Sequence, residues 1–294
     1  MRENGVMAPD LHWPGDGDTV IRWIRAGLQP TDAELVRGLE RVRISADVSG
    51  ATLELLSIDA SGVELGLLPV NDAASGSTAA PGAPEVVQRR PGAIRTVRLI
   101  ADPVRIEGIA VSIDAQIQDI PVEWLVYAGP SIPDQPETIH GIDLADDGAG
   151  MRGAFTISLR SEDLSPLITS LVRPLLAGNG IHLSRLKAKV TQDGADGIRL
   201  DAAAGVRWRL LGASARGTAH VHVSPDGIIT LRDLKVGSRN PLVMLALRAV
   251  RQSVREQIGK SVDLNEDITS AGGPRLTDLR VVAGDDLTVS ARLA

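Results

Sequence analysis

The chain has 294 residues and a mass of 31.0 kDa, which is long enough for one large domain or two modest ones. Hydrophobic residues make up 43% and charged residues 23% of the chain, which excludes global disorder and predicts a folded protein. The net charge of −6 argues against general nucleic-acid binding, which needs an excess of cations. Aromatic residues are only 2%, so the expected core is aliphatic.

The sequence has no cysteine, which excludes disulfides, thiol catalysis and cysteine-ligated metals. Residues 1–20 lack the apolar run of a signal peptide. No segment approaches the roughly 18 unbroken apolar residues that a transmembrane helix needs. These features predict a cytoplasmic protein, with peripheral contact to the inner membrane as an added expectation.

The first 30 residues are interpreted as an N-terminal extension with a short helix. A capping-box pattern, Thr31 with Glu34, then predicts a second helix over 31–40. Residues 31–294 are predicted to form a single α+β domain, because the later elements follow one another without a clear linker.

From residue 41 the hydrophobic period changes to two, which predicts half-buried strands. The clearest alternation runs over 109–117. Residues 71–93 are rich in Gly, Pro, Ser and Ala and show no period, so they are predicted to be a flexible insert in a surface loop. Two more strands are predicted at 139–145 and 151–160.

Apolar residues recur with a helical period over Leu164–Leu176, which predicts a helix there. Ser165 and Pro166 supply a capping residue and a proline suited to the first turn. The rest of the chain contains further strand patterns and one more helical pattern. Strands are predicted at 181–191, 197–210, 213–223 and 227–236, a helix at 240–259, and strands at 276–282 and 287–293. Strands joined by short turns favour an α+β fold in which a long antiparallel sheet packs on a few apolar helices.

His220 and His222 stand two apart on a predicted strand, so both imidazoles point to one face. No cysteine or patterned carboxylate accompanies them, and a solvated sheet face explains them more simply than a metal site. The sequence also lacks a nucleophile elbow, a phosphate-binding loop and a dinucleotide fingerprint. We therefore expect no enzyme activity, no metal and no cofactor, and an enzyme using the two histidines is the weaker alternative.

The two predicted apolar helices offer aliphatic side chains with few polar groups among them. Such a surface suits acyl chains, which present area without hydrogen-bonding groups, but an ordinary core needs the same residues at the same spacing. The residues predicted to line an acyl groove are Leu164, Leu167, Ile168, Leu171, Leu175, Leu247, Val250 and Val254.

Arg248, Arg251 and Arg255 share one face of the helix predicted at 240–259. Guanidinium groups match phosphate oxygens, so these arginines are predicted to hold a lipid headgroup or contact an anionic membrane. The simpler alternative is a solvated helix face.

The succession of elements after residue 95 resembles the LmeA family of actinobacterial phospholipid-binding proteins. The resemblance rests on the strand Phe155–Leu159, the helix Leu164–Leu176, the turn Asp226-Gly227, the helix Leu242–Ile258 and the final strands from Leu276 to Ala291. It implies a tubular lipid-binding (TULIP-like) fold, in which a long curved antiparallel sheet wraps apolar helices and leaves a groove for acyl chains.

Two functional hypotheses follow. The first is non-catalytic binding of a phospholipid or fatty acyl ligand in an aliphatic groove. The second is a structural or protein-interaction module with the same fold and a filled core, which contacts a partner through the 71–93 insert or an edge strand. The sequence indicates no particular protein partner.

Overall fold

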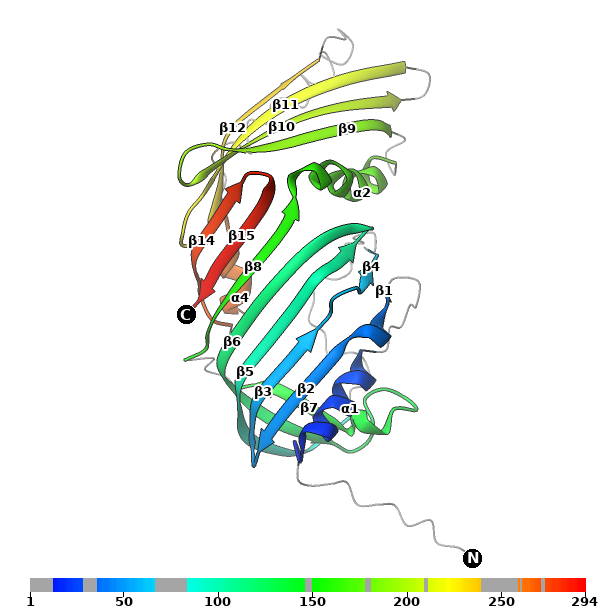
Figure 1. Cartoon of the computed structure of the whole chain (residues 1–294), viewed down its shortest axis with the longest axis vertical. Helices are drawn as coiled ribbons and strands as arrows, with labels where there is room; N and C mark the ends of the chain where they lie inside the picture. Colours follow the sequence, from blue (N-terminus) through cyan, green and yellow to red (C-terminus); the bar gives the residue numbers. More distant parts are fainter. Residues whose placement is uncertain are drawn as a thin grey trace, which may run out of the picture.

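The computed structural model describes residues 13–28, 36–66, 84–145, 150–177, 181–208, 211–238, 259, 261–270 and 273–294. Strands dominate these residues, together with the helices α1 (Gly17–Gly27), α2 (Leu164–Ala177) and α4 (Leu264–Ser270). The predicted α+β class with mainly antiparallel strands is therefore confirmed (Figure 1).

The strands form two sheets instead of the single long sheet that we expected. The first sheet contains β1 (Val36–Arg37), β2 (Arg43–Ser49), β3 (Thr52–Asp59), β4 (Glu64–Leu65), β5 (Val86–Ile106), β6 (Ile109–Tyr127), β7 (His140–Leu144), β8 (Arg152–Arg160), β14 (Leu276–Ala283) and β15 (Asp286–Leu293). The second contains β9 (Ile181–Gln192), β10 (Gly197–Trp208), β11 (Leu211–Val223), β12 (Ile228–Gly237) and β13 (Ser261–Asp263). All described pairs are antiparallel except β3 with β5 and β4 with β5.

The hairpin of β5 and β6 is the longest unit of the first sheet, with strands of 21 and 19 residues. Its turn has only two residues, Glu107 and Gly108, with φ angles of 53° and 78°. Both angles lie in the left-handed region, which matches the twist of the flanking strands and suits glycine at the second position. Strands β3 and β4 pair with β5, and β7 and β8 pair with β6.

Three of the four tryptophans meet where α1 packs on the first sheet. Trp13 lies edge-to-face with Trp23 and Trp124, at centroid distances of 5.3 and 5.7 Å, and stacks on His140 at 4.5 Å. Each indole N–H donates to a backbone carbonyl, from Trp124 to Ala51 for example. Trp13, Pro14 and Val20 of the predicted N-terminal extension are thus buried in the core.

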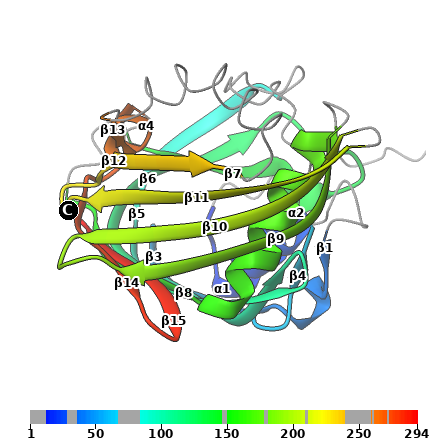
Figure 2. The same ribbon diagram turned by 90° about the horizontal axis from the view of Figure 1, so that it is seen from above.

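The two sheets are joined at one end by a small apolar cluster. Val221 and Val223 of β11 pack against Leu276 and Leu279 of β14. Asn265, which is only 5% exposed, donates to the Asp226 carbonyl and both donates to and accepts from the Leu276 backbone. Away from this junction, α2 lies between the sheets (Figures 1 and 2).

Two expectations about local structure were wrong in the described residues. Residues 36–40 of the helix predicted at 31–40 instead form strand β1 and part of a 3-10 turn at Leu39–Arg41, because pairing of β1 with β4 overrides the local capping pattern. Residues 31–35 lie outside the described residues. Residues 86–93 of the predicted insert belong to β5, where they pair with β6. Residues 71–83 of that insert and 240–258 of the helix predicted at 240–259 lie outside the described residues.

Gly92 provides a test of the packing between β5 and the tryptophan cluster. A Cβ at this position would collide with the Trp124 indole and the Ala51 carbonyl, the two partners of one hydrogen bond. We expect Gly92→Ala to lower the free energy of unfolding by about 1–3 kcal/mol in chemical denaturation. Gly129→Ala is the matched control, because nothing lies within 4 Å of its Cβ position. An equal effect of both changes would contradict this packing.

Candidate functional site

The start of α2 is fixed to the free edge of β9 by one hydroxyl group. Ser165 Oγ donates to the Ala188 carbonyl at 3.0 Å and accepts from the Ala188 N–H at 2.8 Å. These backbone groups are available because β9 is the last strand of the second sheet. Ser165 therefore links helix and sheet instead of capping the helix as predicted, since α2 already begins at Leu164 after a 3-10 turn.

The inner face of the second sheet carries a row of small side chains. Ala188, Ala202, Gly217 and Val236 stand opposite one another across β9, β10, β11 and β12. Gly217 lies on the same face of β11 as Val221, which packs in the junction between the sheets. Small residues at successive pairs leave space beside the backbone that larger side chains would fill.

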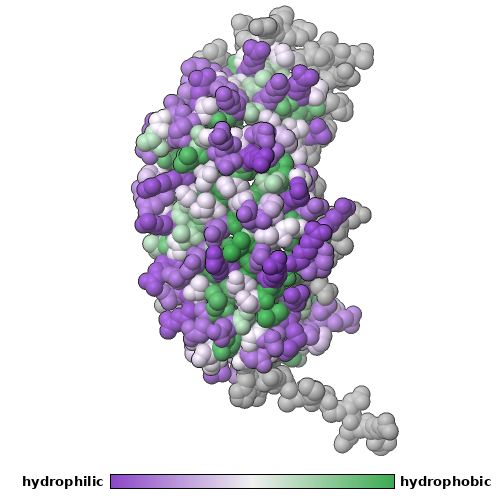
Figure 3. Space-filling model, in the orientation of Figure 1, coloured by the Kyte–Doolittle hydropathy of each residue, from purple (hydrophilic) through white to green (hydrophobic). Residues whose placement is uncertain are grey.

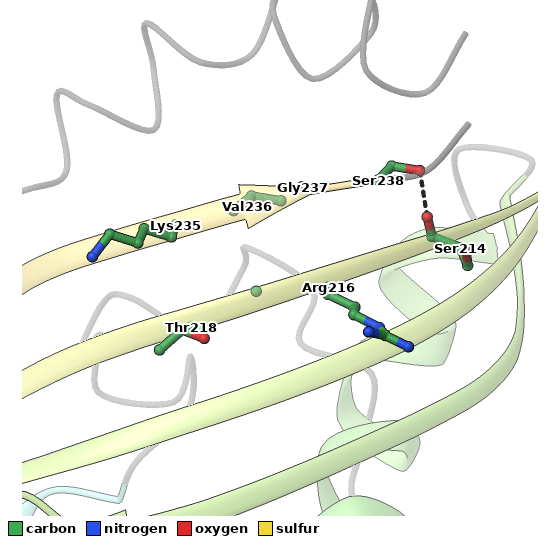
Figure 4. Close-up of a pocket in the computed structure, with 8 residues that line it drawn as sticks. Ser214, Arg216, Thr218, Lys235, Val236, Gly237 and Ser238 are labelled. Carbon is green, nitrogen blue, oxygen red and sulfur yellow. Dashed lines mark hydrogen bonds between the residues drawn. The ribbon is translucent and has the colours of Figure 1, made fainter. Parts of the chain in front are cut away.

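A cavity of about 720 Å³ lies along this row. Three consecutive residues from each of β9, β10 and β11 line it, together with Ser161, Glu162 and Ser165 from the start of α2. A second cavity of about 490 Å³ adjoins it and shares its residues 216–218 of β11. Figure 4 shows this second cavity, with Lys235 and Val236 on β12 and Arg216 and Thr218 on β11.

The opposite face of the sheet is polar and carries charge. Lys189, Asp201, Thr218 and Lys235 form one row across β9 to β12, beside a second row that contains Lys187 and Arg216. Both lysines of β9 and Arg216 are exposed. Because they alternate with the inner residues along the strands, their backbones also border the cavity.

Asp201 is held ionised by its neighbours on this face. Its carboxylate accepts from the Thr218 hydroxyl at 2.7 Å and from Arg199 Nη2 at 3.0 Å. The Thr218 hydrogen bond, followed by the Arg199 interaction, lowers the pKa of Asp201. The Lys235 ammonium, 2.8 Å from the Asp233 carboxylate, likewise lowers the pKa of Asp233.

The structure places the predicted groove residues in several ways. Leu164 is 8% exposed. Leu167 packs against the core cluster that contains Val104 and Ile109, on either side of the turn between β5 and β6. Ile168 is half-buried. Leu171 and Leu175 belong to α2, although their side chains are outside the described residues. The remaining predicted positions also lie outside them, namely Leu247, Val250, Val254, Arg248, Arg251 and Arg255.

The residues that line the cavity were missed by the sequence analysis, although a signal for them exists. Residues 185–189 read Arg-Leu-Lys-Ala-Lys, so cations alternate with apolar residues along β9. This alternation places Arg185, Lys187 and Lys189 on one face and Ala188 on the other. The partners on β10 and β11 could not be assigned without the strand register.

His220 and His222 both lie on β11, as predicted. His220 Nδ1 is 2.7 Å from Asp193 Oδ2 in the turn between β9 and β10. Within the described ranges, no group of three or more His, Asp or Glu side chains is placed to hold a metal ion. Over the same ranges, no helix has the length and apolar character needed to cross a bilayer.

Comparisons with known proteins add no assignment: no family model, no curated protein and no solved structure matches this chain. The class that the described structure itself defines is an α+β protein of two mainly antiparallel sheets with a helix between them.

The link between α2 and β9 can be tested with two serines of the same helix. Ser165→Ala removes both hydrogen bonds to Ala188, and we expect it to lower the free energy of unfolding by about 1–2 kcal/mol. Ser170→Ala removes only a bond to the Leu167 carbonyl within the helix and is expected to have a smaller effect. Denaturation curves of both variants compare them directly, and a larger loss for Ser170→Ala would contradict the proposed link.

The hydrogen bond to Asp201 gives a pH-dependent prediction. Thr218→Val removes the largest cause of the lowered pKa, so the pKa of Asp201 should rise toward its ordinary value. In the unchanged protein, ionised Asp201 contributes stability that is present above the unfolded-state pKa and is lost as the pH falls through the lower folded-state pKa. Carboxyl titration by NMR measures the shift, and Thr230→Val on β12 is the control. An unchanged pKa in Thr218→Val would contradict this account.

Proposed function

We propose that this protein binds a phospholipid or fatty acyl chain, without catalysing a reaction, in the space between α2 and the second sheet. The observation that carries the proposal is the cavity of about 720 Å³ beside Ala188, Ala202 and Gly217. Its size falls within the roughly 300–1,000 Å³ range of small-molecule sites in proteins.

The chemistry of the lining supports an apolar chain as the ligand. The alanine methyl groups and the bare Cα of Gly217 offer a wall without side-chain hydrogen-bonding groups, and each buried CH₂ of an acyl chain contributes about 0.8 kcal/mol. Ser161, Glu162 and Ser165 add a few polar groups to this lining. An acyl chain with a polar head matches a lining that combines small apolar residues with a few polar groups.

The arrangement of elements also supports the resemblance to tubular lipid-binding proteins. Tubular lipid-binding proteins wrap curved antiparallel strands around an apolar helix, and here α2 lies between two curved, mainly antiparallel sheets (Figure 1). We propose that the fold is a variant of the TULIP-like arrangement in the LmeA family. The headgroup role of Arg248, Arg251 and Arg255 stays a prediction.

One observation favours the second hypothesis, a structural or protein-interaction module. Leu164 is buried and Leu167 packs against the core cluster of the first sheet, so this side of α2 behaves as filled core. The two hypotheses therefore make different predictions only for the space between α2 and the second sheet, where the cavity lies. The first hypothesis predicts a bound lipid there, and the second predicts none.

Lipid binding is tested by purifying the protein without detergent and measuring its mass under native conditions. We expect a stoichiometric phospholipid or fatty acid, which organic extraction and mass analysis would identify. Ala202→Phe should reduce the bound lipid at least about tenfold, because the ring occupies the space of the chain. Ala195→Phe, in the exposed turn between β9 and β10, is the matched control.

Thermal unfolding of both variants separates a filled cavity from a damaged fold. The proposal predicts that Ala202→Phe keeps a normal unfolding midpoint, since an open cavity accommodates the ring. A lipid-free protein that also takes up no added phospholipid or fatty acid would overturn the proposal and favour the interaction module.

A further inference from the structure

Charge is strongly segregated on the outer face of the second sheet. Across β9 to β12, the described outward positions hold six exposed cations and two half-buried carboxylates, Asp201 and Asp233, although the whole chain has a net charge of −6. The cations, which we call the cationic face, are Arg185, Lys187, Lys189, Arg199, Arg216 and Lys235.

Both carboxylates are already paired with cations of this face. Asp201 pairs with Arg199 at 3.0 Å, and Asp233 pairs with Lys235 at 2.8 Å. The other four cations form no ion pair with any residue of the described ranges. The cationic face therefore keeps an excess of positive charge that its own carboxylates do not neutralise.

The strand register places the cations of this surface on neighbouring strands. Alternate residues of a strand are separated by about 7 Å, and neighbouring strands by about 5 Å. Arg185, Lys187 and Lys189 thus form a row along β9, and Arg216 lies two strands away from it. Figures 1 and 2 show the second sheet at one end of the molecule, with α2 and the first sheet beneath it.

We propose that the cationic face docks on the surface of an anionic lipid bilayer. Lysine and arginine near such a surface are attracted by its negative potential, and several of them on one face of a sheet act together. Over its described positions the face carries no Phe, Tyr or Trp on which nucleic-acid bases would stack, and no large apolar anchor typical of protein interfaces. Between the cations it presents small or hydroxyl-bearing residues such as Ala203 and Thr218.

Membrane docking goes beyond lipid binding in the cavity and does not require it. Lys187, Lys189 and Arg216 belong to both the cationic face and the border of the cavity, so docking would bring the cavity close to the bilayer. The two activities are measured separately, because vesicle docking depends on surface charge and cavity occupancy depends on the apolar lining.

The test is cosedimentation with vesicles at low salt. We expect the unchanged protein to bind vesicles made of equal parts phosphatidylcholine and phosphatidylglycerol, to bind phosphatidylcholine vesicles far less, and to be released by high salt. Each cation is worth roughly fivefold in binding, so the combined change of Lys187, Lys189 and Arg216 to Glu should weaken binding on the order of a hundredfold or more.

A matched control reverses three exposed arginines elsewhere. Arg25 lies on α1, and Arg90 and Arg98 lie on β5. Changing them to Glu alters the net charge equally, and we expect it to weaken vesicle binding less than tenfold. Equal losses in the two triple variants would overturn the proposal, because they would show a response to net charge alone.

Folding and alternative polyanions are checked in the same preparations. If the glutamate triple variant unfolds, the corresponding glutamine variant should fold and still lose most of its vesicle binding. Failure of the unchanged protein to bind the anionic vesicles would overturn the proposal, whether or not lipid is found in the cavity. Binding to a DNA oligonucleotide without binding to vesicles would overturn it as well.

Discussion

The long hairpin of β5 and β6 is the constraint on which the first sheet depends. The other strands of this sheet attach to it directly or through neighbours, including the two parallel additions to β5. Its two-residue turn at Glu107 and Gly108 starts a ladder of 17 paired positions, and register shifts between Ala101 and Val104 and between Val86 and Gln88 adjust the pairing farther along. The tryptophan cluster then anchors α1 to the far end of this hairpin.

The second sheet is related to the first through two different kinds of contact. At one end, Asn265 and the Val221 cluster hold β11 and β12 against β14. At the edge strand β9, Ser165 holds the start of α2. Because these two contacts hold the second sheet in place, the fold does not require large side chains in the row of Ala188, Ala202, Gly217 and Val236, and this row faces a cavity. Figure 3 shows the exterior in the view of Figure 1, where hydrophobic patches are interspersed among hydrophilic side chains.

The two faces of the second sheet carry opposite chemistry through the ordinary alternation of a strand. Arg-Leu-Lys-Ala-Lys on β9 and its partners on β10 and β11 separate small apolar residues from cations by the thickness of one sheet. An apolar chain and an anionic surface are the ligands that these faces suit. The proposed cavity and the proposed docking face are therefore two sides of the same strands.

The sequence alone determined most strand and helix positions, because local periodicity decides them: β8, α2, β9 to β12 and the last two strands fall where the pattern predicts. It failed at 36–40 and 86–93, where pairing with distant strands outweighs local preference. The division into two sheets, and the meeting of Ala188, Ala202 and Gly217, were decided only by the tertiary structure. Strand register joins residues far apart in the chain, and no local pattern encodes which strands become neighbours.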